Sequence, residues 1–294
     1  MKLLRAATLT VADLDRSIRN YETCFDYTVI ERASLPADLA ASWDAPGAAG
    51  KPYAILRPAS GAEIYLRLVE QAPVPGYAAL RSYGWNAIEI CVEDVLAACA
   101  RVEGSPFEII GPPREIDGLP AIYPMQVRGP DEEIVYLTQI RDDLPAFDLP
   151  RATAPIDRLF ILVLGCSDMK ASLAWMEAHC GLQTGRGEMQ IVYTMLAKAY
   201  GTPMDELHTI STMIHGRDVF LELDQYPPAA IVRPQHAGQL VPGCAIGTLW
   251  HPDFDSLKGP WISPPVRRSG PIYKDRRTAT MKDPDGALIE IVEA

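Results

Sequence analysis

Leu9-Thr10-Val11-Ala12-Asp13 and Leu164-Gly165-Cys166-Ser167-Asp168 are two versions of one strand-to-helix opening, and they lie 155 positions apart. A second pair of matching segments closes the two halves, because Pro130–Leu137 precedes the similar Pro284–Ile291 by 154 positions. Between them, Leu66-Arg67-Leu68 corresponds to Leu221-Glu222-Leu223, again 155 positions later. Three matches in nearly one register indicate the duplication of a unit of roughly 140–150 residues, which is a common domain size.

The duplication predicts two domains, at residues 1–140 and 158–294. Residues 141–157 hold three prolines and four aspartates between the repeated parts. A segment of this composition is typical of a linker. We therefore expect the boundary between the domains there.

Composition restricts the classes of protein that fit. The chain has 294 residues, of which 48% are apolar and 22% charged, which is enough for two globular cores. A net charge of −11 disfavours a nucleic-acid partner, which requires an excess of Lys and Arg. The six cysteines form no C-x-x-C pair, and the chain shows neither a signal-peptide pattern nor an apolar run of membrane-spanning length. We therefore expect reduced thiols, a cytoplasmic location and no membrane partner.

Hydrophobic spacing predicts a repeated order of strands and helices. Asp13 and Asp168 are suited to cap helices, and Gly181 is suited to end the second one. Another short helix is predicted after Asp94, and one more within 191–206. Strands are predicted at residues 2–11, 53–56, 63–69, 87–92, 107–110, 121–127, 133–140, 159–165, 207–214, 218–224, 244–250 and 287–292.

This order resembles the vicinal-oxygen-chelate superfamily of glyoxalases, bleomycin-resistance proteins and extradiol dioxygenases. The most specific pieces are the paired strand–Asp–helix openings and Asp283-Pro284-Asp285-Gly286-Ala287-Leu288-Ile289-Glu290 before the last strand. The resemblance covers nearly the whole chain. It implies an α+β fold of two tandem domains, each built from paired β-α-β-β-β modules that form a curved sheet around a cleft.

The resemblance also implies where a metal would be held. Superfamily enzymes usually bind a divalent ion with His and Glu side chains from strands one, four, five and eight of a domain. In the first half these positions fall on Ala6, Arg67, Ala87 and Tyr136, and no histidine precedes His179. The first half therefore lacks a histidine–carboxylate site of its own.

In the second half the same positions keep two carboxylates. They fall on Phe160 or Ile161, Glu222, Ala245 or Ile246, and Glu290. We expect no metal cofactor, although a weak Mg²⁺ or Mn²⁺ site at Glu222 and Glu290 stays open. The two-histidine-one-carboxylate set of iron dioxygenases is not met.

Two carboxylates without a metal suggest proton-transfer chemistry. Glu222 and Glu290 are each flanked by apolar residues, so both are expected to face one cleft, where their repulsion would raise one pKa. His208 and His251 are further catalytic candidates, because histidine titrates near neutrality. Each of the four also has a structural interpretation, as a paired or packed side chain.

Four side chains are candidates for substrate binding. Arg67 and Tyr136 stand at ligand positions of the first half, where they either contact a substrate or mark a domain that has lost its site. Tyr193 and Trp250 belong to a group of aromatic residues in the second half, suited to a flat, partly apolar ligand.

Three functions stay open from the sequence. The first is a metal-independent lyase or isomerase that acts on a small aromatic or carbonyl-bearing molecule through Glu222 and Glu290. The second is a small-molecule binding protein of the bleomycin-resistance type. The third is an extradiol-type dioxygenase. A homodimer is compatible with each of them.

Overall fold

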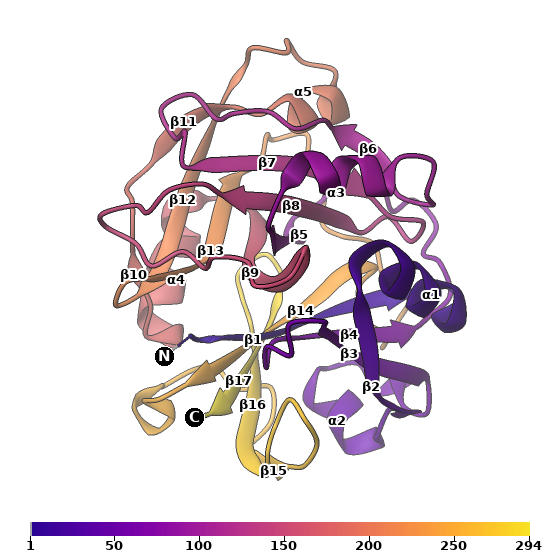
Figure 1. Cartoon of the computed structure of the whole chain (residues 1–294). Coiled ribbons are helices and arrows are strands. Elements are labelled where there is room, and N and C mark those ends of the chain that lie inside the picture. Colours follow the sequence, from indigo (N-terminus) through magenta and orange to yellow (C-terminus); the bar gives the residue numbers. More distant parts are fainter. Residues whose placement is uncertain (1) are drawn as a thin grey trace.

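The computed structural model describes residues 2–294 as two curved β-sheets packed against each other, with short helices at their edges and faces (Figure 1). The α+β class is confirmed. The first sheet has the strand order β15-β16-β17-β14-β1-β4-β3-β2, and the second has β10-β12-β13-β9-β5-β8-β7-β6, with β11 beside β12. Figure 1 places the second sheet in its upper half and the first sheet in its lower half.

The strands of the first sheet come from both ends of the chain. They are β1 Leu4–Val11, β2 Tyr27–Ser34, β3 Pro52–Pro58, β4 Tyr65–Glu70, β14 Gly243–His251, β15 Val266–Arg268, β16 Arg276–Lys282 and β17 Leu288–Glu293.

The strands of the second sheet come from the middle of the chain. They are β5 Gly84–Val92, β6 Glu108–Gly111, β7 Ile122–Arg128, β8 Ile134–Ile140, β9 Ile156–Cys166, β10 Gln183–Thr184, β11 Met189–Val192, β12 Leu207–His215 and β13 Asp218–Gln225.

Aspartates begin the helices that follow the first strand of three modules. Asp13 and Asp168 each accept a hydrogen bond from a backbone N–H three residues later, at the starts of α1 (Leu14–Phe25) and α4 (Met169–Cys180). Asp94 does the same for α3 (Val95–Val102). These side chains satisfy N–H groups that the first helical turn leaves free, as the sequence predicts. In the fourth module the helix is replaced by a single 3₁₀ turn, Phe254–Ser256.

The four modules pair differently from the expectation. The first module (residues 4–70) shares its sheet with the fourth (243–293) through antiparallel pairing of β1 with β14. The second (84–140) shares its sheet with the third (156–225) through β5 and β9. The grouping of residues 1–140 and 158–294 into separate two-module domains is therefore wrong, and 141–157 connects neighbouring strands of one sheet.

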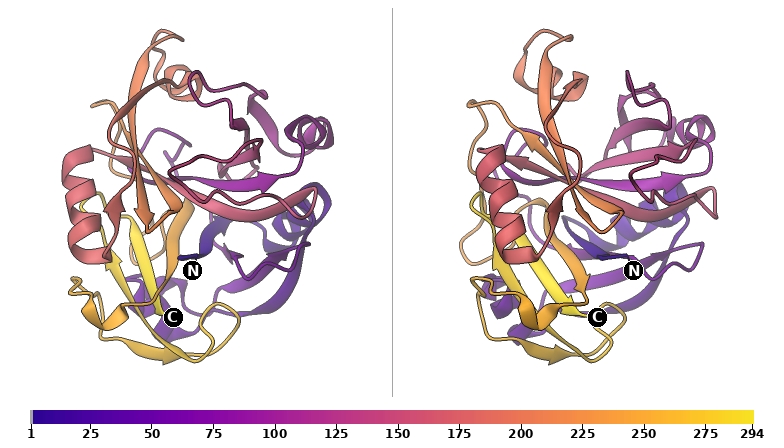
Figure 2. Two further views of the ribbon diagram at one scale, coloured as in Figure 1. Left: turned by 60° about the vertical axis from the view of Figure 1, so that its left-hand side comes forward. Right: turned by 90° about the vertical axis from the view of Figure 1, so that its left-hand side faces the viewer.

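The cause is that alternation defines the faces of a strand but not its partner. Each module offers an equivalent first strand for pairing, and segments 71–83 and 226–242 carry the chain from one sheet to the other. The views in Figure 2 show the two sheets lying across one another. The main core fills the space between them and includes Leu9 and Leu68 of the first sheet with Ile88 and Leu162 of the second.

Each sheet also has an outer face with its own cover. Helix α2 (Ala37–Ser42) and the 3₁₀ turn Pro46–Ala48 pack over the first sheet. Helix α5 (Thr194–Tyr200) and the segments around 110–122 and 144–152 pack over the second. Among residues 2–294 the structure holds no helix with the length and apolarity needed to cross a membrane. The two outer faces are where the family's ligand positions lie.

Candidate functional site: a closed face and an open cavity

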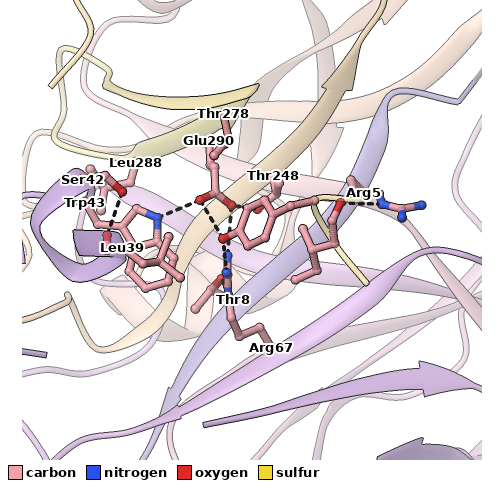
Figure 3. A network of polar contacts seen from close by, with 12 residues as sticks. Arg5, Thr8, Leu39, Ser42, Trp43, Arg67, Thr248, Thr278, Leu288 and Glu290 are labelled. Carbon is pink, nitrogen blue, oxygen red and sulfur yellow. Dashed lines mark hydrogen bonds and ion pairs between the residues drawn. The ribbon is translucent and has the colours of Figure 1, made fainter. Parts of the chain in front are cut away.

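The outer face of the first sheet is closed by a buried polar network around Glu290. Glu290 on β17 accepts hydrogen bonds from Arg67 Nη2 at 3.0 Å, Trp43 Nε1 at 2.8 Å and Thr248 Oγ1 at 2.9 Å. The Tyr273 hydroxyl donates a further one at 3.0 Å. Figure 3 shows the carboxylate between Trp43, Thr248 and Arg67. Both carboxylate oxygens are therefore fully engaged.

Arg67 is held as completely as its partner. Its Nε donates to Thr8 Oγ1 at 2.9 Å, and its guanidinium lies 4.5 Å from the centre of the Trp43 ring. Its side chain and that of Glu290 are each only 1% exposed. Burial alone would lower the pKa of Arg67, but the Tyr273 hydroxyl and the Glu290 carboxylate raise it above its ordinary value. This face thus carries an internal ion pair where a substrate-binding Arg67 was expected.

The outer face of the second sheet keeps an open cavity of about 470 Å³. Tyr136 on β8, Phe160 and Ile161 on β9, and Val219 on β13 contribute to its wall. Residues of β11 and α5, including Ile191 and Met195, close the opposite side. The walls are mostly aliphatic and aromatic, which is the usual composition of a small-molecule site.

Two carboxyl groups lie in the floor of this cavity. Glu222 on β13 is at the family position that the sequence selected, and Glu89 comes from β5 of the other half of the sheet. Thr138 on β8 donates a hydrogen bond to Glu89. Asp224 lies two residues beyond Glu222 on the same face of β13, and it is 1% exposed without a hydrogen-bond donor for either carboxyl oxygen.

The three carboxyl groups hold their protons unusually tightly. Burial and the charge of Glu222 raise the pKa of Glu89 to about 8. Burial raises the pKa of Asp224 to about 8, against a lowering contribution from the neighbouring Glu222 carboxyl, while the charge of Glu89 raises it further. Burial and Asp224 raise the pKa of Glu222 well above its ordinary value. Burial in the apolar surroundings is the largest cause of all three shifts, and the neighbouring carboxyl groups modify it.

Two of the predicted substrate-binding tyrosines meet at this cavity. Tyr193, the residue before α5, and Tyr136 both line it, and their hydroxyl groups contact each other. Burial raises the pKa of Tyr136 well above its ordinary value, with the nearby Asp224 and Glu222 carboxyls adding to the shift. The Tyr136 hydroxyl therefore keeps its proton at neutral pH and can donate a hydrogen bond.

The remaining predicted residues lie elsewhere. Glu290 and Arg67 belong to the first sheet, so the expectation that Glu222 and Glu290 face one cleft is wrong. Trp250 on β14 is also in the first sheet, with the Arg5 guanidinium 4.2 Å from its ring centre. Trp250 does not line the cavity over the second sheet.

The two candidate histidines are outside the cavity as well. His208 on β12 lies in an adjoining groove with Glu206 and Gln225, and its ring meets the edge of Tyr193 at 6.2 Å. His251 ends β14, where its ring centre is 5.7 Å from that of His215. Burial lowers the pKa of both histidines, so both are neutral at physiological pH. Neither contacts the cavity wall at Glu222.

Glu89 and Asp224 are the residues that sequence reasoning missed. Glu89 lies two positions after Ala87, so strand alternation places it on the face of the family ligand position. Asp224 follows Glu222 by the same interval. Strand alternation thus places both residues on the face of the ligand positions. The pairing of the second module with the third, which brings Glu89 close to Glu222, is not visible in the sequence.

Comparisons with known proteins agree with this arrangement. Residues 3–133 match the family model Glyoxalase/Bleomycin resistance protein/Dioxygenase superfamily. The match covers 131 of the 294 residues, so this part of the chain is similar to the superfamily in sequence. No curated protein matches it significantly.

Solved structures of the superfamily share the fold over the whole chain. Glyoxalase I from Zea mays is 20% identical, with a TM-score of 0.64 over 100% of this chain and 92% of that one. A proposed dioxygenase from Bacillus subtilis subsp. subtilis strain 168 is 10% identical, with a TM-score of 0.60 over 99% of this chain and 86% of that one. At these identities the matches establish the fold alone.

The superfamily's metal positions do not fit a metal ion in this chain. In the first sheet these positions include Arg67 and Glu290. In the second sheet they include Tyr136 and Glu222. The first set carries a guanidinium where a cation would bind. Across residues 2–294, no group of three or more His, Cys, Asp or Glu side chains is placed to coordinate an ion.

Proposed function

We propose that the cavity over the second sheet binds a small organic molecule and that its carboxyl groups transfer a proton to or from this molecule, as in a lyase or an isomerase. The observation that carries the proposal is the position of Glu222 and Glu89 in the floor of an apolar cavity. Proton transfer requires a titratable group within reach of the substrate and a pKa near the working pH.

The environment of the two carboxyls separates their tasks. Glu89 has a pKa of about 8 and keeps its proton at neutral pH, which suits an acid. Glu222 lies two residues before Asp224, whose pKa is also about 8, so the loss of one proton from this neighbouring pair near that pH provides a carboxylate base. The apolar walls exclude water and strengthen both interactions.

Tyr136 and Tyr193 extend this assignment to substrate orientation. Both side chains lie in the cavity wall, and the Tyr136 hydroxyl, which keeps its proton, can donate a hydrogen bond to a carbonyl oxygen of the bound molecule. A carbonyl held in this way makes a neighbouring C–H bond more acidic, which is the step that a carboxylate base assists. An aromatic or carbonyl-bearing substrate fits the walls and the donors together.

The test first identifies a ligand and then measures proton exchange on it. A thermal-shift panel of small aromatic ketones and acids identifies compounds that raise the melting temperature, since a ligand of the folded state stabilises it. Exchange of each bound compound's C–H protons is then followed by NMR in D₂O. We expect Glu222→Gln to slow exchange or turnover by about 10² or more while the Kd changes little.

The matched control is Glu188→Gln, which removes an equal charge from an exposed position that does not line the cavity. It should exchange at the wild-type rate. Normal exchange in both Glu222→Gln and Glu89→Gln would contradict the catalytic assignment.

The apolar lining of the cavity, considered without its carboxyl groups, favours a second function. The aromatic and aliphatic lining suits sequestration of a small molecule in the manner of a bleomycin-resistance type binding protein. Tight binding in the cavity without proton exchange or turnover of any ligand would select it. A dioxygenase receives no such support, because neither set of family positions supplies a two-histidine-one-carboxylate site.

A further inference from the structure

The outer faces of the two sheets differ in whether a buried carboxyl group has a cationic partner inside the protein. In the first sheet, a carboxylate at a family position, Glu290, meets a guanidinium, Arg67, supplied by the other module. In the second sheet, Glu222 stands at the position equivalent to Arg67, since each lies on the last strand of its module, opposite Val163 of β9 and Thr8 of β1 respectively. A carboxyl thus replaces the cation, and the space beside it is open.

The carboxyls of the second sheet have no internal cation. Within the described chain, no Lys, Arg or His forms an ion pair with Glu89, Glu222 or Asp224, whereas eighteen such pairs occur elsewhere. Glu89 has one donor, the Thr138 hydroxyl, and Asp224 has none for either oxygen. Buried carboxyls without partners cost free energy that a ligand can recover.

The charged residues of the cavity are arranged by depth. The floor holds the buried Glu89 and the half-buried Glu222. Charged side chains of both signs lie exposed at the mouth, and these are Arg114, Glu115, Asp117, Arg186 and Lys198. Only the floor carries acidic groups without basic ones, so the floor determines which charge is preferred at the inner end of a bound ligand.

From these contacts we infer that the ligand of this cavity is a small organic cation, with a guanidinium or protonated amine at Glu222 and Glu89 and an apolar body against Phe160 and Ile191. The inference rests on one part of the proposed function, that this cavity binds a small organic molecule, and it specifies the class of that molecule. The first sheet shows the complementary arrangement inside the protein, where a guanidinium bridges a carboxylate and a tyrosine hydroxyl beside an aromatic ring. Tyr136 and Phe160 provide the corresponding aromatic surface in the cavity.

Binding of a cation also has consequences for protons. The empty cluster holds protons at neutral pH because Glu89 and Asp224 have pKa values of about 8. A bound cation favours the ionised carboxyls, so binding releases protons to the solvent and tightens as the pH rises towards 8. The groups that face this cluster are Thr138 and Tyr136 of β8, Tyr193 before α5, Tyr226 after β13 and Cys91 of β5. None of them is cationic.

The experiment compares three probes of one shape. These are 1-naphthylmethylguanidinium, the neutral isostere 1-naphthylmethylurea and the anion 1-naphthylacetate, titrated into the full-length protein by calorimetry. We expect the guanidinium to bind about tenfold or more tightly than the urea, since charge-assisted hydrogen bonds replace neutral ones. The guanidinium stays charged between pH 6 and 8.5, so its tighter binding at the higher pH reports the carboxyls. Calorimetry in buffers of different ionisation enthalpy measures the proton release.

Variants connect the preference to the carboxyls. Glu89→Gln and Glu222→Gln should each reduce the preference for the guanidinium over the urea, while Glu188→Gln should keep it. Far-UV circular dichroism and thermal unfolding establish that each variant is folded. Equal binding of urea and guanidinium, tighter binding of the acid, or a preference that persists in both cavity variants would overturn the inference.

The outcomes also separate this inference from the proposed function. Ile191→Trp fills the cavity from its β11 side, where Ile191 is half-buried. If the urea binds as well as the guanidinium and Ile191→Trp abolishes both, the cavity is a ligand site and the cation class is wrong. If the guanidinium does not bind at all, the cation class is wrong, and the exchange assay above decides the proposed function independently.

Discussion

Arg67 and Glu222 occupy equivalent places in the duplicated chain, yet they have opposite surroundings. Arg67 is enclosed by donors and acceptors that satisfy it, and Glu222 borders open space. A cleft that contains its own counter-ion has no place for a ligand, because displacing the ion pair would leave two buried charges unpaired. The outer face of the first sheet is therefore closed around an internal ion pair, and the cavity lies over the second sheet.

Breaking the Arg67–Glu290 pair should strongly destabilise the protein. Arg67→Met leaves the Glu290 carboxylate buried without its cation, which costs about 3–5 kcal/mol of the free energy of unfolding. Arg128→Met is the matched control, since Arg128 and Glu108 form an exposed pair with side chains 41% and 61% accessible. That control should cost less than about 1 kcal/mol. Urea denaturation measures both, and equal effects would contradict the structural role of the network.

The raised pKa of Glu89 should appear in the pH dependence of stability. Below about pH 4.5 the carboxyl is protonated in both states, and above about pH 8 it is ionised in both. Between these values the unfolded state loses the proton that the folded state keeps, so the free energy of unfolding falls as pH rises. Glu89→Gln should flatten this fall by about 1–3 kcal/mol between pH 5.5 and 7.5.

The measurement is a difference between two proteins, because Glu133 and Asp283 have pKa values raised to about 8 and about 7 and contribute a similar slope. These groups are present in both the wild type and Glu89→Gln. Parallel stability curves for the two proteins across this range would show that the pKa of Glu89 is ordinary.

The elements that the sequence predicted are those with a local cause. Helices α1 and α4 follow from their capping aspartates, and Gly181 ends α4 in the left-handed conformation, with φ of 62°. The final strand follows from the Asp283–Gly286 turn, where the Asp283 carboxylate accepts hydrogen bonds from two backbone N–H groups. Each of these features depends on a few neighbouring residues.

The elements that were missed depend on distant partners. Strand β2 alternates in burial only because β3 pairs with it, and β16 holds its place between β15 and β17. Neither has a strong apolar pattern of its own. The same reason explains why Glu89 escaped notice: a buried carboxyl on one strand becomes a candidate only when the partner strand brings Glu222 near it.

Gly247 of β14 lies directly against side chains of the second sheet. A Cβ at this residue would lie 2.7 Å from Leu162 Cδ1 and 2.9 Å from Trp85 Cζ2 of the second sheet. Gly247→Ala should therefore destabilise the protein by about 1–3 kcal/mol through overpacking. Gly187→Ala, which meets no atom within 4 Å, should have little effect. Thermal unfolding of the two variants tests the contact, and similar melting temperatures would argue against it.

The pairing of modules governs the cooperativity of the whole molecule. The first sheet joins residues from both ends of the chain, and the second joins its two middle modules across segment 141–155. The main core is continuous between the sheets. The duplication visible in the sequence therefore produces one interlocked body, although the repeat itself suggests two separable domains.

Division of the chain at residue 146 tests this interlocking. Residues 2–146 would hold half of each sheet, and the exposed edges would be β1 and β5, the strands that pair with β14 and β9 in the intact protein. Unpaired, apolar edge strands of this kind lead to aggregation. We expect each fragment alone to lack a cooperative unfolding transition, and we expect the co-expressed fragments to purify as a 1:1 complex. A fragment that contains only part of each sheet cannot bury the core between the sheets. Two fragments that unfold cooperatively and elute separately would therefore contradict the interlocking and show that each half forms its own domain.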